Sequence, residues 1–265
     1  MKYGFIGTGN MASAIIRGMC IGDTFENSDI LGFNRTVSKA EKLAEECGIT
    51  VCASLEEVMK KSDVVVMAVK PQQFKNIIPG MKENLREGQL IISIAAGKDI
   101  KYLQNELGEN THVARVMPSV ASQVLMSTSC YACSENTTKD EIETIEKMFG
   151  KVGSIIEVEE ELFGVFSAVG CASPAFTYMY IDALARGGVK GGMSKKKAIE
   201  VAANSVMGAA KMVLELNKHP YDLVDEVCSP AGTTIEGVCT LHERGFVDAA
   251  EKAVTAVIEK DNKMK

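Results

Sequence analysis

The sequence has 265 residues and a mass of 28.5 kDa, which is room for one large domain or two modest ones. Hydrophobic residues make up 46% and charged residues 24%, so the chain can build a sizeable core. The net charge of -6 argues against nucleic acid or an anionic membrane as the main partner. Uninterrupted apolar runs stay well below the roughly 20 residues of a membrane span, and glycines follow the start too soon for a signal peptide. We therefore expect a cytoplasmic protein.

Short apolar runs alternate with helical patterns through the first half of the chain. The runs at 63–69 and 90–95 are almost continuously apolar, as in strands that are buried on both faces of a parallel sheet. The expected strands are 3–7, 30–34, 63–69, 90–95, 113–117, 130–133 and 155–158. The expected helices are 10–19, 38–47 and 139–149, with Ser38 as the N-cap of the second. This alternation predicts βαβ units and an α/β fold with a parallel sheet.

From residue 159 onward the strand pattern disappears and long helical patterns follow. One of them keeps mostly small or apolar residues at helical spacing: Ala198, Val201, Ala202, Ser205, Ala209, Met212, Val213 and Leu216. Another helix, from the same chain or from a second copy, can approach such a seam closely. We predict two domains, an α/β domain over residues 1–159 and a helical domain over residues 160–265.

The cysteines and histidines give little support for a metal site. The eight cysteines form no CxxC pair, and only His112, His219 and His242 are present to complete a ligand set. Cysteines among aliphatic residues commonly act as small hydrophobic residues in reduced form. We therefore expect reduced thiols and no metal, and we assign no histidine as a general acid.

The segment Ile6-Gly7-Thr8-Gly9-Asn10-Met11-Ala12 joins the first strand to the first helix. Gly7 permits a tight turn, and Gly9 lets the backbone approach a pyrophosphate, which the helix N-terminus attracts. Ala12 still allows the helix to pack closely on the strand. The strand–turn–helix context predicts a dinucleotide phosphate loop, with a purely structural glycine turn as the alternative.

The end of the second strand indicates which dinucleotide binds. NAD sites usually place Asp or Glu there for the ribose hydroxyls, but this chain has Asn34-Arg35-Thr36. Arg35 can pair with a 2′-phosphate while its neighbours donate hydrogen bonds, so NADPH is predicted and NADH is the alternative cofactor. A solvated surface arginine is the other interpretation of Arg35. Two further strand ends are expected to flank the cofactor, Ala68-Val69-Lys70-Pro71 and Ala95-Ala96.

A second dense segment contains Ser229-Pro230-Ala231-Gly232-Thr233-Thr234. Thr233 and Glu236 have the spacing of a capping box, so a helix is expected to begin there. The turn before it exposes backbone N–H groups, which attract a small carboxylate at a helix start. An ordinary Ser-Pro-Gly turn followed by a helix cap is the alternative.

In their order and spacing these segments resemble the pyrroline-5-carboxylate reductase family. The resemblance covers essentially the whole chain and is carried by residues 7–11, 68–71, 93–97, 191–193, 206–212, 219–220 and 228–235. It implies a Rossmann-type NAD(P)-binding domain followed by an all-α dimerisation and substrate domain. It also implies homodimers, which often assemble into decamers, and the NAD(P)H-dependent reduction of L-1-pyrroline-5-carboxylate to L-proline.

The resemblance also implies roles for the second segment. Gly232 and Thr233 would bind the substrate carboxylate through their backbone, with Ser229 in support. The hydroxyl of Thr234, the expected catalytic residue, would hydrogen-bond the ring nitrogen.

The chain departs from the family's usual pattern in three places. Ser119-Val120-Ala121 stands where members have Asn-Thr-Pro, Leu55 stands where many carry an adenosine-contacting Asn, and residues 170–176 replace Ser-Gly-Ser-Gly-Pro-Ala-Tyr. These changes support a second hypothesis, a related imine or 2-keto reductase such as one acting on the six-membered piperideine analogue. A third hypothesis is a non-catalytic dinucleotide-binding regulator, which would bind cofactor without turnover.

Overall fold

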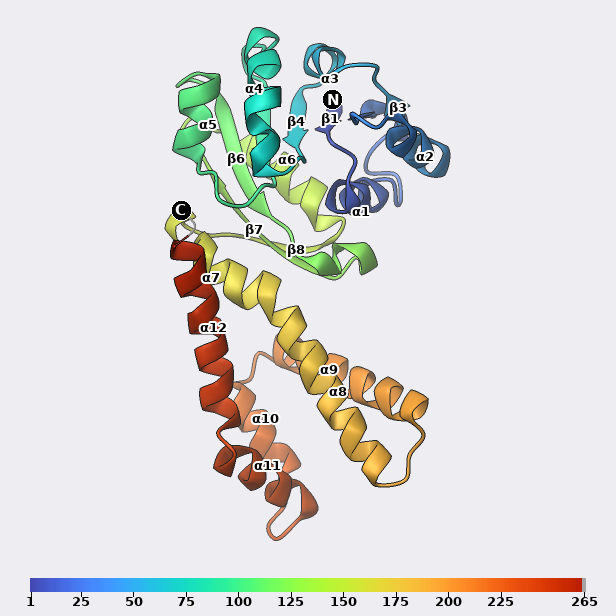
Figure 1. The fold of residues 1–265 in the computed structure, drawn as a ribbon, viewed down its shortest axis with the longest axis vertical. Coiled ribbons are helices and arrows are strands. Elements are labelled where there is room, and N and C mark those ends of the chain that lie inside the picture. The colour runs from blue at the N-terminus through green and yellow to red at the C-terminus, as the bar shows by residue number, and fades with distance from the viewer. Residues whose placement is uncertain (264–265) are drawn as a thin grey trace. The chain divides into compact units, whose positions relative to one another are not determined.

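The computed structural model describes residues 1–263, which form two compact units divided after Cys171 (Figure 1). The first unit is built on one eight-stranded sheet with the order β3-β2-β1-β4-β5-β6-β7-β8. Its strands are β1 (Tyr3–Ile6), β2 (Ile30–Phe33), β3 (Thr50–Val51), β4 (Val64–Met67), β5 (Leu90–Ser93), β6 (His112–Met117), β7 (Ser127–Cys133) and β8 (Gly153–Glu157). The chain order reverses at β1, between β2 and β4, which makes this the switch point of the sheet.

Strands β1 to β6 are parallel, as predicted, but β7 is antiparallel to β6. The sequence predicted a parallel sheet but gave no direction for this strand. A parallel neighbour needs a crossover of a dozen or more residues, and the connection over 118–126 is too short for one. The next connection contains a whole helix, so β8 returns parallel to β7.

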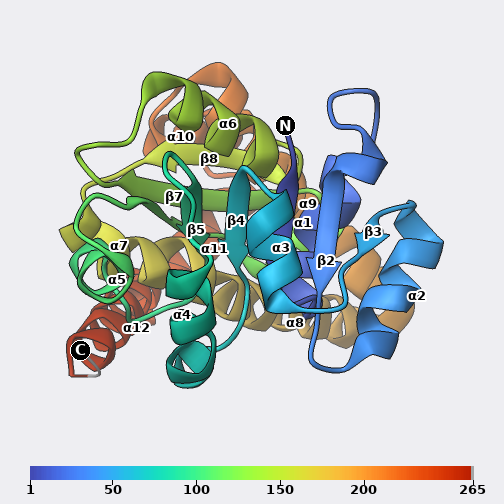
Figure 2. The same cartoon turned by 90° about the horizontal axis from the view of Figure 1, so that it is seen from above.

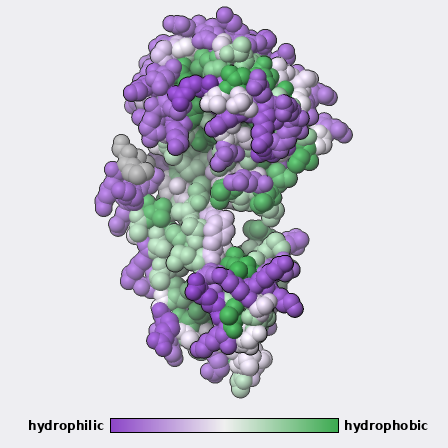
Figure 3. All heavy atoms as spheres, turned by 45° about the vertical axis from the view of Figure 1, so that its right-hand side comes forward, coloured by the Kyte–Doolittle hydropathy of each residue, from purple (hydrophilic) through white to green (hydrophobic). Residues whose placement is uncertain are grey.

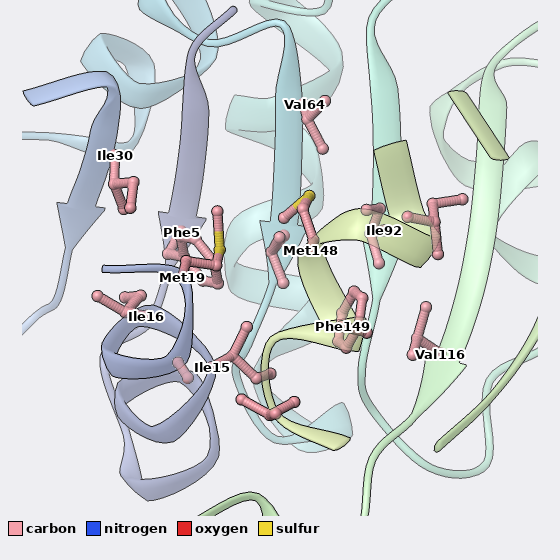
Figure 4. Close-up of a cluster of buried hydrophobic side chains, with 14 of the residues drawn as sticks. Phe5, Ile15, Ile16, Met19, Ile30, Val64, Ile92, Val116, Met148 and Phe149 are labelled. Atoms are coloured by element: carbon pink, nitrogen blue, oxygen red, sulfur yellow. The ribbon is translucent and has the colours of Figure 1, made fainter. Parts of the chain in front are cut away.

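Helices cover both faces of this sheet (Figure 2). The first unit contains α1 (Asn10–Met19), α2 (Val37–Cys47), α3 (Leu55–Lys61), α4 (Phe74–Glu83), α5 (Ile100–Leu107), α6 (Lys139–Gly150) and α7 (Phe163–Phe166). Because side chains alternate along a strand, Phe5 of β1 enters the core beneath α1, α2 and α6. Its neighbour Ile6 enters the opposite core, beneath α3, α4 and α5. Figure 4 shows the first core, where Phe149 of α6 lies near Ile15 of α1.

The helix boundaries match the predictions closely, but one cap does not. Helix α1 spans the predicted residues, whereas α2 begins at Val37 with Thr36 at the N-cap position. Ser38 therefore lies inside the first turn, and the prediction that it caps α2 is wrong. The reason is that β2 ends one residue earlier than expected, so the chain enters the helix sooner.

A partly buried ion pair fixes the end of the first unit to its sheet. Arg115 of β6 donates to Glu160 over 2.7 Å, and its guanidinium lies 4.4 Å from the ring centre of Phe163. The same carboxylate oxygen of Glu160 accepts from the backbone N–H of Ile100, the first residue of α5, over 2.9 Å. One carboxylate therefore connects β6, α5 and the short helix η4 (Glu160–Leu162). The chain continues through α7 and the π-helix η5 (Ser167–Ala172).

The second unit is helical, as predicted. It contains α8 (Ser173–Lys190), α9 (Lys195–Leu216), α10 (Pro220–Val227), α11 (Thr233–Glu243) and α12 (Phe246–Asn262). Within the described part of this unit, Ala185, Ala198 and Ala202 are the buried hydrophobic residues. The predicted seam on α9 is thus covered at its first two turns only, while Val201, Met212 and Leu216 are exposed. Figure 3 shows many hydrophobic side chains on the surface of these helices.

The helical stretch over residues 160–190 is long and apolar enough, by length and composition, to cross a membrane. The expectation stated above concerns uninterrupted apolar runs. In this helix small polar residues and glycines interrupt the apolar residues, so no long uninterrupted run occurs. The mean hydropathy of an 18-residue window is nevertheless high enough for a membrane span.

Candidate active site

Gly7 brings three strand ends together at the switch point of the sheet. Its N–H donates to the carbonyl of Phe33 at the end of β2 over 2.8 Å. Its φ is +102°, and a Cβ at this position would lie 2.7 Å from the carbonyl oxygen of Ala68, which follows β4. Only glycine fits both the left-handed backbone and this approach. The phosphate loop therefore meets the residues after β2 and β4 in one place.

The loop and the start of α1 have the features of a cradle for an anion. Gly9 is the N-cap of α1, and space is open where its Cβ would lie. Within residues 1–263, side chains neither cap this helix nor place an acid in its first turn. The hydroxyl of Thr8 is buried, with the residue 3% exposed, and has no hydrogen-bond partner in the same range. These donors fit a dinucleotide pyrophosphate, because the helix N-terminus supplies both N–H groups and a positive field.

The start of α2 forms a second anion-attracting end beside the first. The amide of Asn34 donates to the carbonyl of Thr36 over 3.0 Å and orders the turn. In the described chain the hydroxyl of Thr36 does not cap α2, and the first turn of α2 holds no acidic residue. Arg35 is exposed and Lys39 follows in the same turn. This surface carries positive charge and hydrogen-bond donors where an NAD site would carry a carboxylate.

The other predicted cofactor residues follow β4 and β5 at the same edge of the sheet. Ala68 donates from its N–H to Ile6 over 2.9 Å, so residues 68 and 69 continue beside the phosphate loop. Lys70 is exposed and directly precedes the short helix η2 (Pro71–Gln73), so it also lies where the strand segment ends and a helical turn begins. Ala95 and Ala96 follow β5, where Ile94 donates to Met67. The predicted set is thus gathered along the carboxyl edge of the parallel strands.

The second predicted segment forms the turn before α11. Ala231 has a φ of +56°, unusual for a residue with a side chain, and the N–H of Gly232 donates to the carbonyl of Ser229 over 2.9 Å. A Cβ at Gly232 would lie 2.3 Å from the hydroxyl oxygen of Ser229. Glycine is therefore required for the serine hydroxyl to lie close against the turn.

The capping box predicted for Thr233 and Glu236 is wrong, because α11 begins one residue earlier than that motif requires. Gly232 is the N-cap, so Thr233 is already the first helical residue. Since the N–H of Gly232 is used within the turn, the first N–H groups available to a ligand are those of Thr233 and Thr234. Glu236 lies in the first turn, so this helix end attracts anions less strongly than those of α1 and α2.

Sequence reasoning missed a group of buried serines beside the departures at 119 and 171. Ser119 is 3% exposed and bonds through both its N–H and its hydroxyl to the hydroxyl of Ser127. Cys171 of η5 contacts the carbonyl of Pro118 through its sulfur at 3.9 Å. Alternate serines in the segment Ser127-Thr128-Ser129 were the available signal, since alternation places both on one face of a strand.

Two further predictions concern metals and histidines. The described residues contain no cluster of three His, Cys, Asp or Glu side chains that could hold a metal ion. His112 pairs with Glu141 over 2.8 Å, and His219 is the N-cap of α10, where its ring accepts from the N–H of Tyr221. Both histidines therefore have structural partners, Glu141 and the N–H of Tyr221.

The Rossmann-type sheet, the phosphate loop at its switch point and the helical second unit define a dinucleotide-dependent oxidoreductase. Residues 2–97 match the family model described as NADP oxidoreductase, coenzyme F420-dependent, and residues 160–264 match the model described as pyrroline-5-carboxylate reductase dimerisation. Over 263 residues the chain is 35% identical to the pyrroline-5-carboxylate reductase of Methanosarcina acetivorans, covering 99% of this chain and 97% of that protein. The enzyme of the same name from Escherichia coli is 34% identical, with 99% and 98% covered. The chain belongs to the pyrroline-5-carboxylate reductase family.

Solved structures agree with this placement. A pyrroline-5-carboxylate reductase from Coxiella burnetii superimposes with a TM-score of 0.95 at 29% identity, covering 100% of this chain and 98% of that one. The Plasmodium falciparum enzyme, solved with NADP bound, gives a TM-score of 0.87 at 26% identity, with 100% and 98% covered. The resemblance stated from the sequence is confirmed, as is the class of NAD(P)-dependent oxidoreductase.

The half-buried thiol of Cys171 leads to a prediction of pH dependence. Burial raises the pKa of the Cys171 thiol to about 11. Because the thiolate is the reacting form, alkylation of Cys171 by iodoacetamide should rise about tenfold per pH unit from pH 8 to pH 10, whereas the thiol of an unstructured cysteine peptide, with a pKa of about 8.5, levels off above about pH 9. Timed labelling followed by peptide mass spectrometry measures both rates. A plateau for Cys171 below pH 9 would contradict the prediction.

Proposed function

We propose that the protein reduces L-1-pyrroline-5-carboxylate to L-proline with NADPH, the last step of proline synthesis. The observation that carries this proposal is the start of α11, where no side chain of the described residues caps the first N–H groups, those of Thr233 and Thr234, and the hydroxyl of Ser229 lies against the N-cap Gly232. Such a set binds a small carboxylate and leaves one hydroxyl for a ring nitrogen. Family membership of the whole chain supports the same reaction.

The residues proposed to bind the cofactor surround the switch point described above. They are Ile6, Gly7, Thr8, Gly9, Asn10 and Met11 for the pyrophosphate, Asn34, Arg35 and Thr36 for the 2′-phosphate, and Ala68, Val69, Lys70, Pro71, Ala95 and Ala96 along the strand ends. When bound, NADPH supplies the hydride. NADH remains the alternative reductant, and the cationic start of α2 favours NADPH.

In the proposed reaction the hydride adds to the imine carbon and one proton is taken up by the ring nitrogen, giving the secondary amine and NADP⁺. The backbone of Thr233 and the hydroxyl of Ser229 hold the carboxylate, and Gly232 contributes by letting that hydroxyl lie close. Thr234 is the proposed catalytic residue, because its hydroxyl can hydrogen-bond the ring nitrogen and orient the incoming proton. Holding the ring in one orientation is most of what this chemistry asks of the protein.

We further propose that the enzyme is a cytoplasmic homodimer, with residues 1–159 binding cofactor and residues 160–265 forming the dimerisation and substrate domain. The second unit buries little of its apolar surface within one chain, with Leu214 of α9 83% and Met179 of α8 74% exposed. Exposed apolar area on this scale marks an interaction surface. The dimerisation model that matches residues 160–264 makes a second copy the fitting partner. Assembly of dimers into a decamer is the further state that the resemblance suggests.

The first test concerns Thr234. Thr234→Ala should lower kcat/KM with L-1-pyrroline-5-carboxylate at least tenfold, about 1.4 kcal/mol in the barrier, because the ring nitrogen loses its hydrogen-bond partner. Thr234→Ser should restore most of the rate. Thr240→Ala, which removes a hydroxyl bonded to the Glu236 carbonyl two turns into the same helix, is the control.

Three outcomes of that assay would count against the proposal. Cofactor binding without turnover by the unaltered protein would favour the regulator hypothesis. Faster turnover of the six-membered piperideine analogue would favour the related imine reductase. Full activity of Thr234→Ala would remove the assigned role of this hydroxyl.

The second test separates the two cofactors. Arg35→Ala should raise KM for NADPH about tenfold and leave KM for NADH within twofold, because only NADPH carries the phosphate that the guanidinium would pair with. Steady-state rates with each cofactor measure the difference. Lys42→Ala makes the same charge change seven residues later, within α2, and should alter neither value. Equal losses with both cofactors for Arg35→Ala would argue against phosphate recognition.

The third test concerns assembly. Leu214→Asp should shift the protein toward the monomer, because a dimer would have to bury the new charge. Light scattering during gel filtration gives the mass, and distinguishes one, two and ten chains. Glu215→Gln, at an exposed neighbouring position, should leave the mass unchanged. A monomeric unaltered protein would disprove the dimer.

A further inference from the structure

The turn that follows β6, residues 118–126, lies at the carboxyl edge of the parallel strands. Its short helix η3 (Val120–Val124) packs against α1, the helix that begins at the phosphate loop. Ligands of open α/β sheets bind outside this edge. If the proposed function holds, on which this inference rests, the turn borders the nicotinamide end of the cofactor.

Hydrogen bonds among four buried serines fix this turn: Ser119, Ser122, Ser127 and Ser129. The hydroxyl of Ser127, the first residue of β7, accepts from the N–H of Ser119 over 3.0 Å. It also bonds to the hydroxyls of Ser119 and Ser129 over 3.2 and 3.1 Å. The hydroxyl of Ser122 donates to the carbonyl of Ser119 over 2.8 Å. Each of these residues is at most 3% exposed, so water does not replace a lost bond easily.

Ser127 is the rigid member of this group. Its N–H donates to Val152 over 2.7 Å, and its backbone lies so close to Gly153 of β8 that a Cβ there would be 2.0 Å from the Ser127 carbonyl oxygen. The hydroxyl of Ser127 therefore connects the tightly packed backbone of β7 to the 118–126 turn, which has fewer such constraints.

The turn is held in a conformation that it would not adopt by itself. Leu125 ends η3 with a φ of +58°, a left-handed value that disfavours side chains. Such residues persist where the surrounding structure fixes them. The N–H of Leu125 donates to the carbonyl of Ser122, a member of the serine group.

The same contacts decide what Ser119 can do. Its hydroxyl and N–H both face Ser127, so neither is offered to a ligand at the edge of the sheet. The family usually has Asn at this position. Ser119 instead uses its polar groups in hydrogen bonds to Ser127, which help to fix the conformation of the turn.

We infer that Ser127 is a positioning residue for hydride transfer, because its hydroxyl holds the 118–126 turn as a fixed wall beside the nicotinamide. It touches neither cofactor nor substrate, and acts through Ser119 and the backbone of the turn. If the Ser127 hydroxyl is removed, we expect the nicotinamide to be more mobile. The affinity for the cofactor should be almost unchanged, because the phosphate loop and α2 bind the rest of it.

The test compares Ser127→Ala with Thr128→Ala. The control removes a hydroxyl from the next residue of β7, which points to the other face and bonds to Ser154 over 3.0 Å. Ser127→Ala should lower kcat about tenfold, keep the Kd for NADPH within twofold, and shorten the fluorescence lifetime of bound NADPH. Thr128→Ala should change none of these three.

Equal lifetimes and equal kcat for the two variants would overturn the inference, even if Ser127→Ala melts at a lower temperature, because that pattern describes a merely structural hydroxyl. If Ser127→Ala does not fold, Ser119→Ala removes one oxygen of the same group, and should shift kcat and lifetime in the same direction by about threefold. The absence of both shifts there would also overturn it.

The lifetime separates this inference from the proposed function. An unaltered protein that binds NADPH but leaves L-1-pyrroline-5-carboxylate unreduced disproves the proposed function, while the lifetimes of the two variants still decide the role of Ser127. An unaltered protein that does not bind NADPH disproves both.

Discussion

The close approach of Gly7 to Ala68 is the constraint on which the rest of the candidate site depends. A turn this tight against β4 forces the chain directly into α1 and aims the start of that helix at the sheet edge. The same contact places the ends of β2 and β4 beside the loop. The residues proposed to select the cofactor at α2 and those proposed to orient it at the later strand ends are therefore both positioned relative to one glycine.

Much of this first unit was predictable from sequence because its signals are local. The bounds of α1 follow from apolar spacing between Asn10 and Met19, and the buried strands follow from continuous apolar runs. The pattern does not contain the direction of β7, which the sequence therefore left undetermined. Direction depends on the length of the connection and on what β7 pairs with, and these are properties of the folded sheet.

The caps show a second kind of limit. Ser38 and Thr233 both have the right side chain for an N-cap, yet in both helices the cap is an earlier residue, Thr36 or Gly232. A hydroxyl in the first turn of the helix is equally compatible with the composition of the segment. In each case the displaced cap leaves helix-start N–H groups without a side-chain acceptor, which is the arrangement a ligand requires.

In the second unit, local sequence patterns predict the helices but not how these helices pack. The seam on α9 has correct helical spacing, but spacing does not say whether the covering helix belongs to the same chain, and most of the seam is exposed in one copy. In the serine group behind the 118–126 turn, only the alternation of Ser127 and Ser129 is visible in the sequence. Their contact with Ser119 is not, because Ser119 and Ser127 come from different elements and meet only when β7 folds back.

The shared carboxylate of Glu160 has a consequence for exchanging parts between relatives. Glu160 opens the region that matches the dimerisation family, yet its partners Arg115 and Ile100 belong to the sheet and to α5. A chimera joined at residue 160 would bring in a foreign residue at this position and risk leaving a buried guanidinium without its acceptor. Joining after Phe163 keeps the carboxylate, the guanidinium and the aromatic ring together. The practical boundary between exchangeable parts therefore lies several residues inside the helical region.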